Sequence, residues 1–137
     1  MEQGQFALHL VKLGHLWRRR LVGFLGQLNH IYERDLTVRF VLPDGMEYNT
    51  ADSEDYSRFL QEQPALADTL RALRQQLLAN PALTEKIRRK YRTKNTVGYG
   101  LNALLDFEHP LDMMAHLLPG AEGTLAFIAD AILLTLP

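Results

Sequence analysis

Cysteine is absent from this 137-residue sequence, which excludes disulfide bonds, a thiol nucleophile, and cysteine-ligated zinc or iron–sulfur clusters within the chain. The same absence fits a reducing compartment, and we expect a cytoplasmic location. Because no run of about 18 apolar residues occurs, we expect no transmembrane helix. Residues 1–5 lack positive charge and residues 18–20 interrupt the early apolar stretch, so no signal peptide is expected.

An excess of charge of either sign is also absent, because 15 Lys and Arg residues face 16 Asp and Glu residues, giving a formal net charge of −1. Overall basicity therefore gives no argument for nucleic-acid binding. The composition, with 47% hydrophobic and 23% charged residues, is ordinary for a globular protein. A chain of this length fits one domain, and we find no internal repeat.

The first part of the chain combines a helical pattern with a β-type pattern. Apolar residues recur every three or four positions over residues 6–31 and predict a helix. Apolar and polar residues alternate over residues 36–42 and predict a strand, and residues 46–50 predict its return. Pro43, Asp44 and Gly45 predict the turn between them, because proline presets φ and glycine accepts positive φ. We therefore expect a β-hairpin.

Helical periodicity dominates the middle of the chain. Pro64 ends one helix or begins the next, and Asn80 before Pro81 is typical of a helix start. The patterns predict helices over residues 53–61, 65–79, 81–91 and 110–118, a helical turn over 101–105, and a strand over 124–134. The expected fold class is α+β, a few antiparallel strands packed with helices. It comprises a helical segment over residues 1–30 and a second part over 31–137, with a helical insertion at about 53–91.

A basic cluster occupies the second half of the last of the three central helices and the residues that follow it. Its members are Lys86, Arg88, Arg89, Lys90, Arg92 and Lys94. These cations can meet phosphate groups of a nucleic acid or of a cofactor. The alternative is a solvated helix end, where cations also suit the helix macrodipole. The sequence leaves both interpretations open.

A glycine turn near the C-terminus has the local chemistry of an anion site. Gly120 and Gly123 flank Ala121 and Glu122, and glycines without a Cβ let backbone N–H groups approach an anion closely. The predicted strand after Thr124 would anchor this turn. An ordinary turn is the alternative, since glycine is common in turns. The segment is neither a phosphate-binding P-loop nor the dinucleotide fingerprint, because the spacing of its glycines and the following residues differ.

Two segments resemble a known flavoprotein superfamily. Gly120-Ala121-Glu122-Gly123-Thr124-Leu125 resembles the G-S/A-E-G-T-L signature of the vanillyl-alcohol oxidase/p-cresol methylhydroxylase (PCMH) superfamily. Lys94-Asn95-Thr96-Val97-Gly98-Tyr99-Gly100-Leu101-Asn102-Ala103-Leu104 is similar to the K-N-T-x-G-Y-x-L-N-A-L block of large D-lactate and D-2-hydroxyacid dehydrogenases of the glycolate-oxidase type. Asp106-Phe107, Pro110-Leu111-Asp112 and His116-Leu117-Leu118 continue the similarity. It covers residues 31–134 and is strongest toward the C-terminus.

The resemblance implies part of a PCMH-type FAD-binding domain, belonging to an enzyme that oxidises a D-2-hydroxy acid to the 2-oxo acid. It places Gly120, Ala121, Glu122, Gly123 and Thr124 against the FAD, with Asn95, Thr96, Gly98, Tyr99 and Asn102 nearby. Tyr99 either packs on the flavin or adenine ring or is a core aromatic residue. Glu122 is expected to brace the turn by hydrogen bonds rather than to act as a base.

Several parts of that family are not found in the sequence: the first phosphate-binding loop, the substrate domain, and the paired metal-binding and catalytic histidines. We therefore expect a fragment without catalytic residues, inactive by itself, whose partners are FAD and the remainder of the enzyme or a second chain. The i,i+4 spacing of Asp112 and His116 is a weak metal signal, and we predict no metal. The alternative function is a non-catalytic helical adaptor that binds an acidic partner or RNA through residues 86–94.

Overall fold

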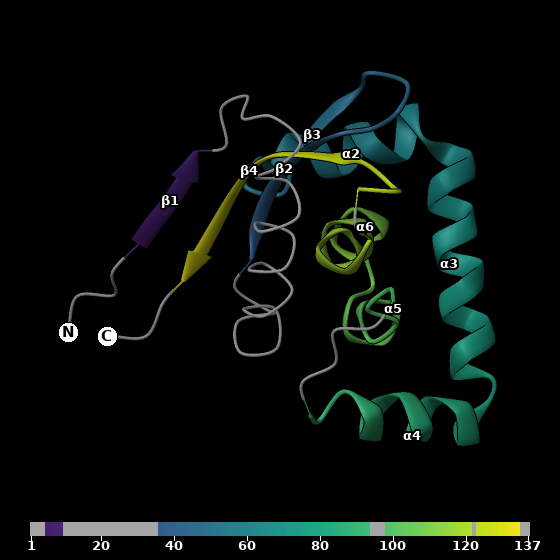
Figure 1. Ribbon diagram of the computed structural model, residues 1–137. Coiled ribbons are helices and arrows are strands. Elements are labelled where there is room, and N and C mark those ends of the chain that lie inside the picture. Colours follow the sequence, from purple (N-terminus) through teal and green to yellow (C-terminus); the bar gives the residue numbers. More distant parts are fainter. Residues whose placement is uncertain (1–4, 10–35, 94–97, 122, 135–137) are drawn as a thin grey trace.

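The computed structural model describes residues 5–9, 36–93, 98–121 and 123–134 (Figure 1). Within these residues four strands form one sheet in the order β1-β4-β2-β3. The strands are β1 (Gln5–His9), β2 (Thr37–Val41), β3 (Glu47–Asn49) and β4 (Phe127–Leu134). The helices are α2 (Ser53–Glu62), α3 (Pro64–Leu78), α4 (Pro81–Lys90), α5 (Ala103–Asp106) and α6 (Pro110–Leu117), followed by the 3-10 turn η2 (Leu118–Gly120). The α+β fold class is confirmed.

Every neighbouring pair of strands in the sheet is antiparallel. Strands β2 and β3 form the predicted hairpin, and Gly45 in its turn has a φ of 88°. Strand β4 comes last in the chain yet lies between β1 and β2, pairing Thr37 with Ile132 and Val41 with Phe127. The register shifts between Arg39 and Phe40, which is a β-bulge or irregularity. The segment that follows the glycine turn is thus fixed in the centre of the sheet.

The hydrophobic core lies between the sheet and the helices. Val38 and Phe40 of β2 are fully buried, whereas the alternate residues of that strand are partly exposed, as the period-2 pattern predicts. The rings of Tyr48 and Phe59 meet edge to face with centroids 5.0 Å apart. Helix α6 contributes Leu111 and Met113, among others, to the same core. Figure 1 shows α5 and α6 beside α3, with α4 running across its far end.

Local capping explains where the helices begin. The Asp52 carboxylate accepts a hydrogen bond from the Glu54 N–H, and the Asn80 side chain accepts one from the Leu83 N–H. Pro64, Pro81 and Pro110 occupy the first turns of their helices. A backbone N–H at this position has no partner within the helix, so proline, which has no N–H, costs no hydrogen bond there. Each of the predicted helices after residue 50 is confirmed, with ends within a few residues of those expected.

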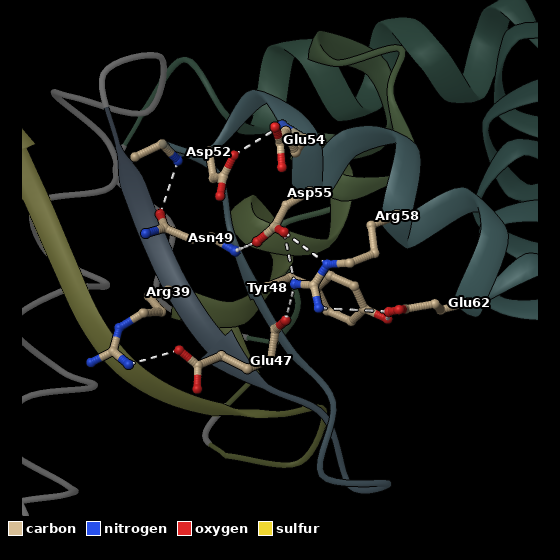
Figure 2. A network of polar contacts seen from close by, with 10 residues as sticks. Arg39, Glu47, Tyr48, Asn49, Asp52, Glu54, Asp55, Arg58 and Glu62 are labelled. Carbon is tan, nitrogen blue, oxygen red and sulfur yellow. Dashed lines mark hydrogen bonds and ion pairs between the residues drawn. The ribbon is translucent and has the colours of Figure 1, made fainter.

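A polar network fixes α2 to the hairpin (Figure 2). Asp55, although buried, accepts hydrogen bonds from the Asn49 N–H at 2.7 Å and from the Arg58 guanidinium at 2.9 Å. The guanidinium of Arg58 also lies over the Tyr48 ring, 4.8 Å from its centroid. The buried carboxylate therefore has charged and backbone donors, which such burial requires. This network joins α2 to the hairpin and includes no residue of the glycine turn.

The expected helix over residues 6–31 is wrong at residues 6–9, which belong to strand β1 and pair with β4. The backbone hydrogen bonds of an antiparallel partner outweigh a local helical pattern, which is a weak guide when tertiary pairing competes. The rest of that expected helix lies outside the described residues. The final strand begins at Phe127 rather than at residue 124. None of the helices in the described ranges is both long and apolar enough to cross a membrane.

Candidate functional site

Two glycine segments that are far apart in the sequence pack against each other. They are residues 98–101, which precede α5, and residues 120–124, which precede β4. A Cβ atom built on Gly120 would lie 2.8 Å from the carbonyl oxygen of Gly98 and 3.2 Å from the backbone nitrogen of Gly100. Real Cβ contacts are not this short, so a side chain at position 120 would force the two segments apart. Glycine is required here by the close approach of backbone to backbone.

The turn at residues 120–124 is closed by hydrogen bonds to its own backbone. The Ala121 N–H donates to the Leu118 carbonyl at 3.1 Å, which continues η2 into the turn. The Thr124 N–H donates to the Ala121 carbonyl at 2.9 Å, and the Thr124 hydroxyl donates to the same oxygen at 2.6 Å. Gly123 has a φ of 78°, a conformation that favours glycine. Thr124 therefore belongs to the turn, and β4 begins three residues later, at Phe127.

Tyr99 connects the two segments through its side chain. Its hydroxyl lies 2.8 Å from the Thr124 hydroxyl oxygen. Because the Thr124 proton is donated to the Ala121 carbonyl, Tyr99 is the donor in this contact. Tyr99 is nevertheless 44% exposed, which excludes the alternative of a core aromatic residue. The result is an aromatic ring fixed at its hydroxyl end and accessible from solvent.

Tyr91, which follows the last turn of α4, is hydrogen-bonded to residues 98–101. Its hydroxyl donates to the Tyr99 carbonyl at 2.9 Å and accepts from the Leu101 N–H at 3.2 Å. Sequence reasoning missed this residue. Its two partners lie eight and ten residues away, outside any helical spacing, so no local pattern indicates the contact. Tyr91 thus joins α4 directly to the glycine segment.

Asn102, another predicted site residue, is buried beneath the first segment rather than displayed on it. A Cβ atom on Gly100 would lie 3.3 Å from the Asn102 side-chain oxygen. The Asn102 carbonyl accepts from the Leu105 N–H at 2.9 Å and so begins the short helix α5. Its place below the surface makes Asn102 a support of the segment rather than an exposed contact.

Arg74 of α3 holds the end of α5, the helix that follows residues 98–101. This role was not predicted from the sequence either. One guanidinium nitrogen donates to the carbonyls of Leu104, Leu105 and Phe107 at 2.8, 2.7 and 2.9 Å. These carbonyls belong to the end of α5, where helical partners run out. A cation at a helix C-terminus also suits the macrodipole. Arg74 therefore fixes α5, and with it the residues that precede α5.

Asp112 and His116, the residues with metal-like spacing, are engaged elsewhere. The His116 ring nitrogen Nδ1 lies 2.7 Å from the backbone carbonyl of Asp112, and its ring stacks on Phe107 with centroids 3.8 Å apart. The Asp112 carboxylate accepts a hydrogen bond from the Tyr56 hydroxyl at 2.7 Å. Burial, followed by the carboxylate contact, raises the pKa of Tyr56. Among the described residues no group of three possible metal ligands occurs.

The structure thus brings together six of the predicted site residues: Gly98, Tyr99, Gly120, Ala121, Gly123 and Thr124. Asn95, Thr96 and Glu122 lie outside the described residues. Apart from the Tyr99 phenol, the described residues of the two segments have no ionisable side chain. Their chemistry is that of binding, through backbone groups and an aromatic ring, rather than of proton transfer or nucleophilic attack.

No known protein family, curated protein or solved structure matches the sequence.

Proposed function

We propose that this chain carries part of a PCMH-type FAD-binding domain of a flavin-dependent oxidoreductase, whose substrate is a D-2-hydroxy acid of the D-lactate type. The observation that supports the proposal most is the contact between the two glycine segments. The resemblance assigns both to the cofactor site, and Tyr99 and Thr124, 25 residues apart, join them through a hydrogen bond. Two separate sequence signals thus converge on one place in the fold.

The local chemistry suits such a cofactor. Gly98 and Gly123 both have positive φ and carry no Cβ, and a Cβ at Gly98 would meet nothing within 4 Å, so a ligand can approach the backbone closely there. The Ala121 and Thr124 N–H groups donate to carbonyls of the chain itself, so the Gly123 N–H is the group of this turn that we assign to the FAD pyrophosphate. The exposed ring of Tyr99 offers a flat apolar surface for an isoalloxazine or adenine ring. FAD itself supplies the hydride acceptor for oxidation of the hydroxy acid to the 2-oxo acid.

The chain's own residues would hold and orient the cofactor. Thr124 and Tyr91 fix Tyr99 at its hydroxyl and at its carbonyl, so the ring needs little further ordering when a ligand binds. No described residue is assigned a catalytic role. The proposal includes a cytoplasmic location, for which the absence of cysteine is the supporting observation.

The deciding experiment is FAD retention by the whole chain. The protein is incubated with FAD, desalted, and examined for visible flavin absorption, and the affinity is measured by quenching of flavin fluorescence. We expect bound flavin with the wild-type sequence and loss of at least about tenfold in affinity for Gly123→Val, because a β-branched residue strongly disfavours positive φ. A colourless wild-type protein with unquenched flavin would overturn the proposal.

Gly45→Val is the matched control. Gly45 also has a positive φ, of 88° against 78° for Gly123, but it lies in the hairpin turn. Both variants carry a similar backbone strain, so a loss of affinity confined to Gly123→Val assigns the effect to the turn. Equal losses would indicate general destabilisation instead.

A second pair of variants tests the aromatic ring. Tyr99→Phe keeps the ring and loses only the hydroxyl contact with Thr124, whereas Tyr99→Leu loses the ring. If the ring stacks on the cofactor, Tyr99→Leu weakens FAD binding by about tenfold and Tyr99→Phe by much less, since stacking is worth about 1 kcal/mol or more. Charge reversal at Arg88 and Arg89 is expected to have a smaller effect than either Gly123→Val or Tyr99→Leu.

A further inference from the structure

The basic residues of the described chain fall into two groups. Arg39, Arg58, Arg71, Arg74 and Arg92 each form an ion pair with a carboxylate. Lys86, Arg88, Arg89 and Lys90 form none within the described residues, and all four belong to α4. The positive charge that the described fold leaves without a carboxylate is therefore concentrated on one helix.

Stability of the helix does not explain this concentration. Helix α4 is held by buried Ile87 and by Thr84, whose hydroxyl donates to the Leu77 carbonyl at 2.6 Å. The four cations are exposed and take no part in these contacts. Favourable interaction with the macrodipole extends only over the last turn, which contains Arg88, Arg89 and Lys90 but not Lys86. Neither helix packing nor the macrodipole therefore accounts for the positive charge of Lys86.

An apolar side chain lies beside the cations. Leu83, on α4 itself, is 39% exposed. Lys86 and Lys90 follow Leu83 by three and seven positions, a spacing that places all three on one flank of the helix. The figure shows α4 at the far end of the helical layer from the sheet (Figure 1). The surface thus combines exposed leucine with unpaired positive charge at one end of the molecule.

Arg89 follows Lys86 by three positions and therefore lies next to it, on the solvent side of this flank. We propose that this surface of α4, defined by Leu83, Lys86, Arg89 and Lys90, docks a partner protein through a segment that carries carboxylates beside apolar side chains. Charge complementarity selects an acidic partner. The exposed Leu83 favours a protein, because interfaces between proteins bury apolar side chains with the charges at the rim. This docking surface is independent of FAD binding, so either property can fail without the other.

The confined extent of the cluster argues against the other polyanions. Residues 86–90 span only about 6 Å of helix, at about 1.5 Å per residue. Nucleic acid and anionic bilayers present negative charge over much longer distances and attract proteins through extended basic surfaces. The remaining arginines of the described residues are neutralised by their own carboxylates, and the net charge of the chain is −1. A short acidic segment matches this surface better.

The test uses a defined probe, a fluorescent twelve-residue peptide with the repeated unit Glu-Glu-Leu, and measures its binding to the full chain by anisotropy at low salt. We expect binding that weakens by about fivefold with Arg89→Glu, within the range known for exposed charge pairs. Arg71→Glu, an exposed arginine of α3, changes the net charge by the same amount and is expected to leave the affinity within about twofold. Leu83→Ser is expected to weaken binding at constant charge.

Three outcomes would overturn the proposal. The first is no peptide binding, and the second is an equal loss with Arg89→Glu and Arg71→Glu, which would indicate an effect of net charge alone. The third is tighter binding of a twelve-nucleotide RNA, or of vesicles of phosphatidylcholine and phosphatidylserine, than of the peptide. Circular dichroism of each variant shows whether the fold is kept, and the peptide with Lys-Lys-Leu repeats controls for apolar binding without complementary charge.

Discussion

The carbonyl oxygen of Gly98 lies 2.8 Å from the point that a Cβ atom would occupy on Gly120. Both the neighbouring contacts at this point, with Gly100 and Tyr99, are also with backbone atoms. Backbone cannot rotate away as a flexible side chain can, so the two glycine segments are in contact only while position 120 has no side chain. This relationship makes Gly120 the residue on which the candidate site depends most directly.

Gly120→Ala is therefore expected to destabilise the protein by about 1–3 kcal/mol, the usual cost of forcing an extra group into a packed site. The measurement is urea unfolding followed by circular dichroism. Gly45→Ala serves as the comparison, because a Cβ at Gly45 meets nothing within 4 Å and adds only the cost of positive φ. Equal stability of Gly120→Ala and wild type would show that the segments separate without cost.

The hydroxyl of Tyr91 is expected to hold residues 98–101 in place. Tyr91→Phe removes a donor to the Tyr99 carbonyl and an acceptor for the Leu101 N–H. The Leu101 N–H keeps its hydrogen bond to the Tyr99 carbonyl at 2.9 Å but loses the one to Tyr91. We expect a loss of about 1 kcal/mol in stability, and a larger increase in hydrogen exchange at Leu101 than the global loss of stability accounts for.

Tyr48→Phe is the control for this local effect. Tyr48 is buried, and its hydroxyl donates to Glu62 of α2 at 2.8 Å, with no hydrogen bond to the glycine segments among the described residues. Its variant lowers global stability without selectively exposing the Leu101 amide. If the two variants change exchange at Leu101 by the same factor, Tyr91 has no particular role in positioning the segment.

The elements with local signals were the ones that the sequence predicted correctly. Asn80 before Pro81 marks a helix start in any context, and Pro43, Asp44 and Gly45 mark the hairpin turn by their own backbone preferences. The alternation in β2 reports which residues are buried. Strand β1 was missed because its partner, β4, is at the other end of the chain, so only the tertiary pairing stabilises it.

The sequence named the two glycine segments as a candidate site, but it did not predict how they pack together. The glycines, Tyr99 and Thr124 were named from the resemblance. The positive φ of Gly98 and Gly123, which Gly100 and Gly120 do not share, was not predicted. The contact between Gly98 and Gly120 was not predictable, because it depends on how α5 and α6 place the two segments. Tyr91 acts through contacts that exist only after folding, as Arg74 does.

Arg74 gives the clearest case of a residue whose role comes from the fold. Arg74→Lys keeps the charge but replaces the guanidinium that reaches the three carbonyls at the end of α5. We expect the free energy of unfolding to fall by about 2 kcal/mol, because half-buried carbonyls that lose a charged donor are left without a hydrogen bond.

Arg71→Lys, one turn earlier on α3, is the matched control. Arg71 is exposed and pairs only with Asp68 at 3.7 Å, an i,i+3 contact. Its replacement is expected to change stability by no more than about 0.5 kcal/mol. Urea unfolding of both variants provides the comparison, and similar midpoints would contradict the assigned role of Arg74.

We expect the stability of the protein to depend on pH through the protonation of His109. Burial lowers the pKa of His109 below its ordinary value, and the nearby Arg71 lowers it further, while Asp112 opposes both. Its ring nitrogen Nδ1 accepts the Leu111 N–H at 3.1 Å and so caps α6, which requires that nitrogen to be unprotonated. The Tyr56 ring packs against the imidazole with centroids 4.8 Å apart.

Because the folded-state pKa is depressed, the neutral ring contributes its full stability above the unfolded-state pKa near 6.5. This contribution is lost as the pH falls from there through the lower folded-state pKa. His109→Asn keeps an acceptor for the cap but cannot be protonated, so its stability should fall less than that of the wild type over this interval. Thermal unfolding between about pH 7.5 and 5 compares the two proteins. Parallel pH profiles would assign the acid sensitivity to other groups and contradict the role of His109.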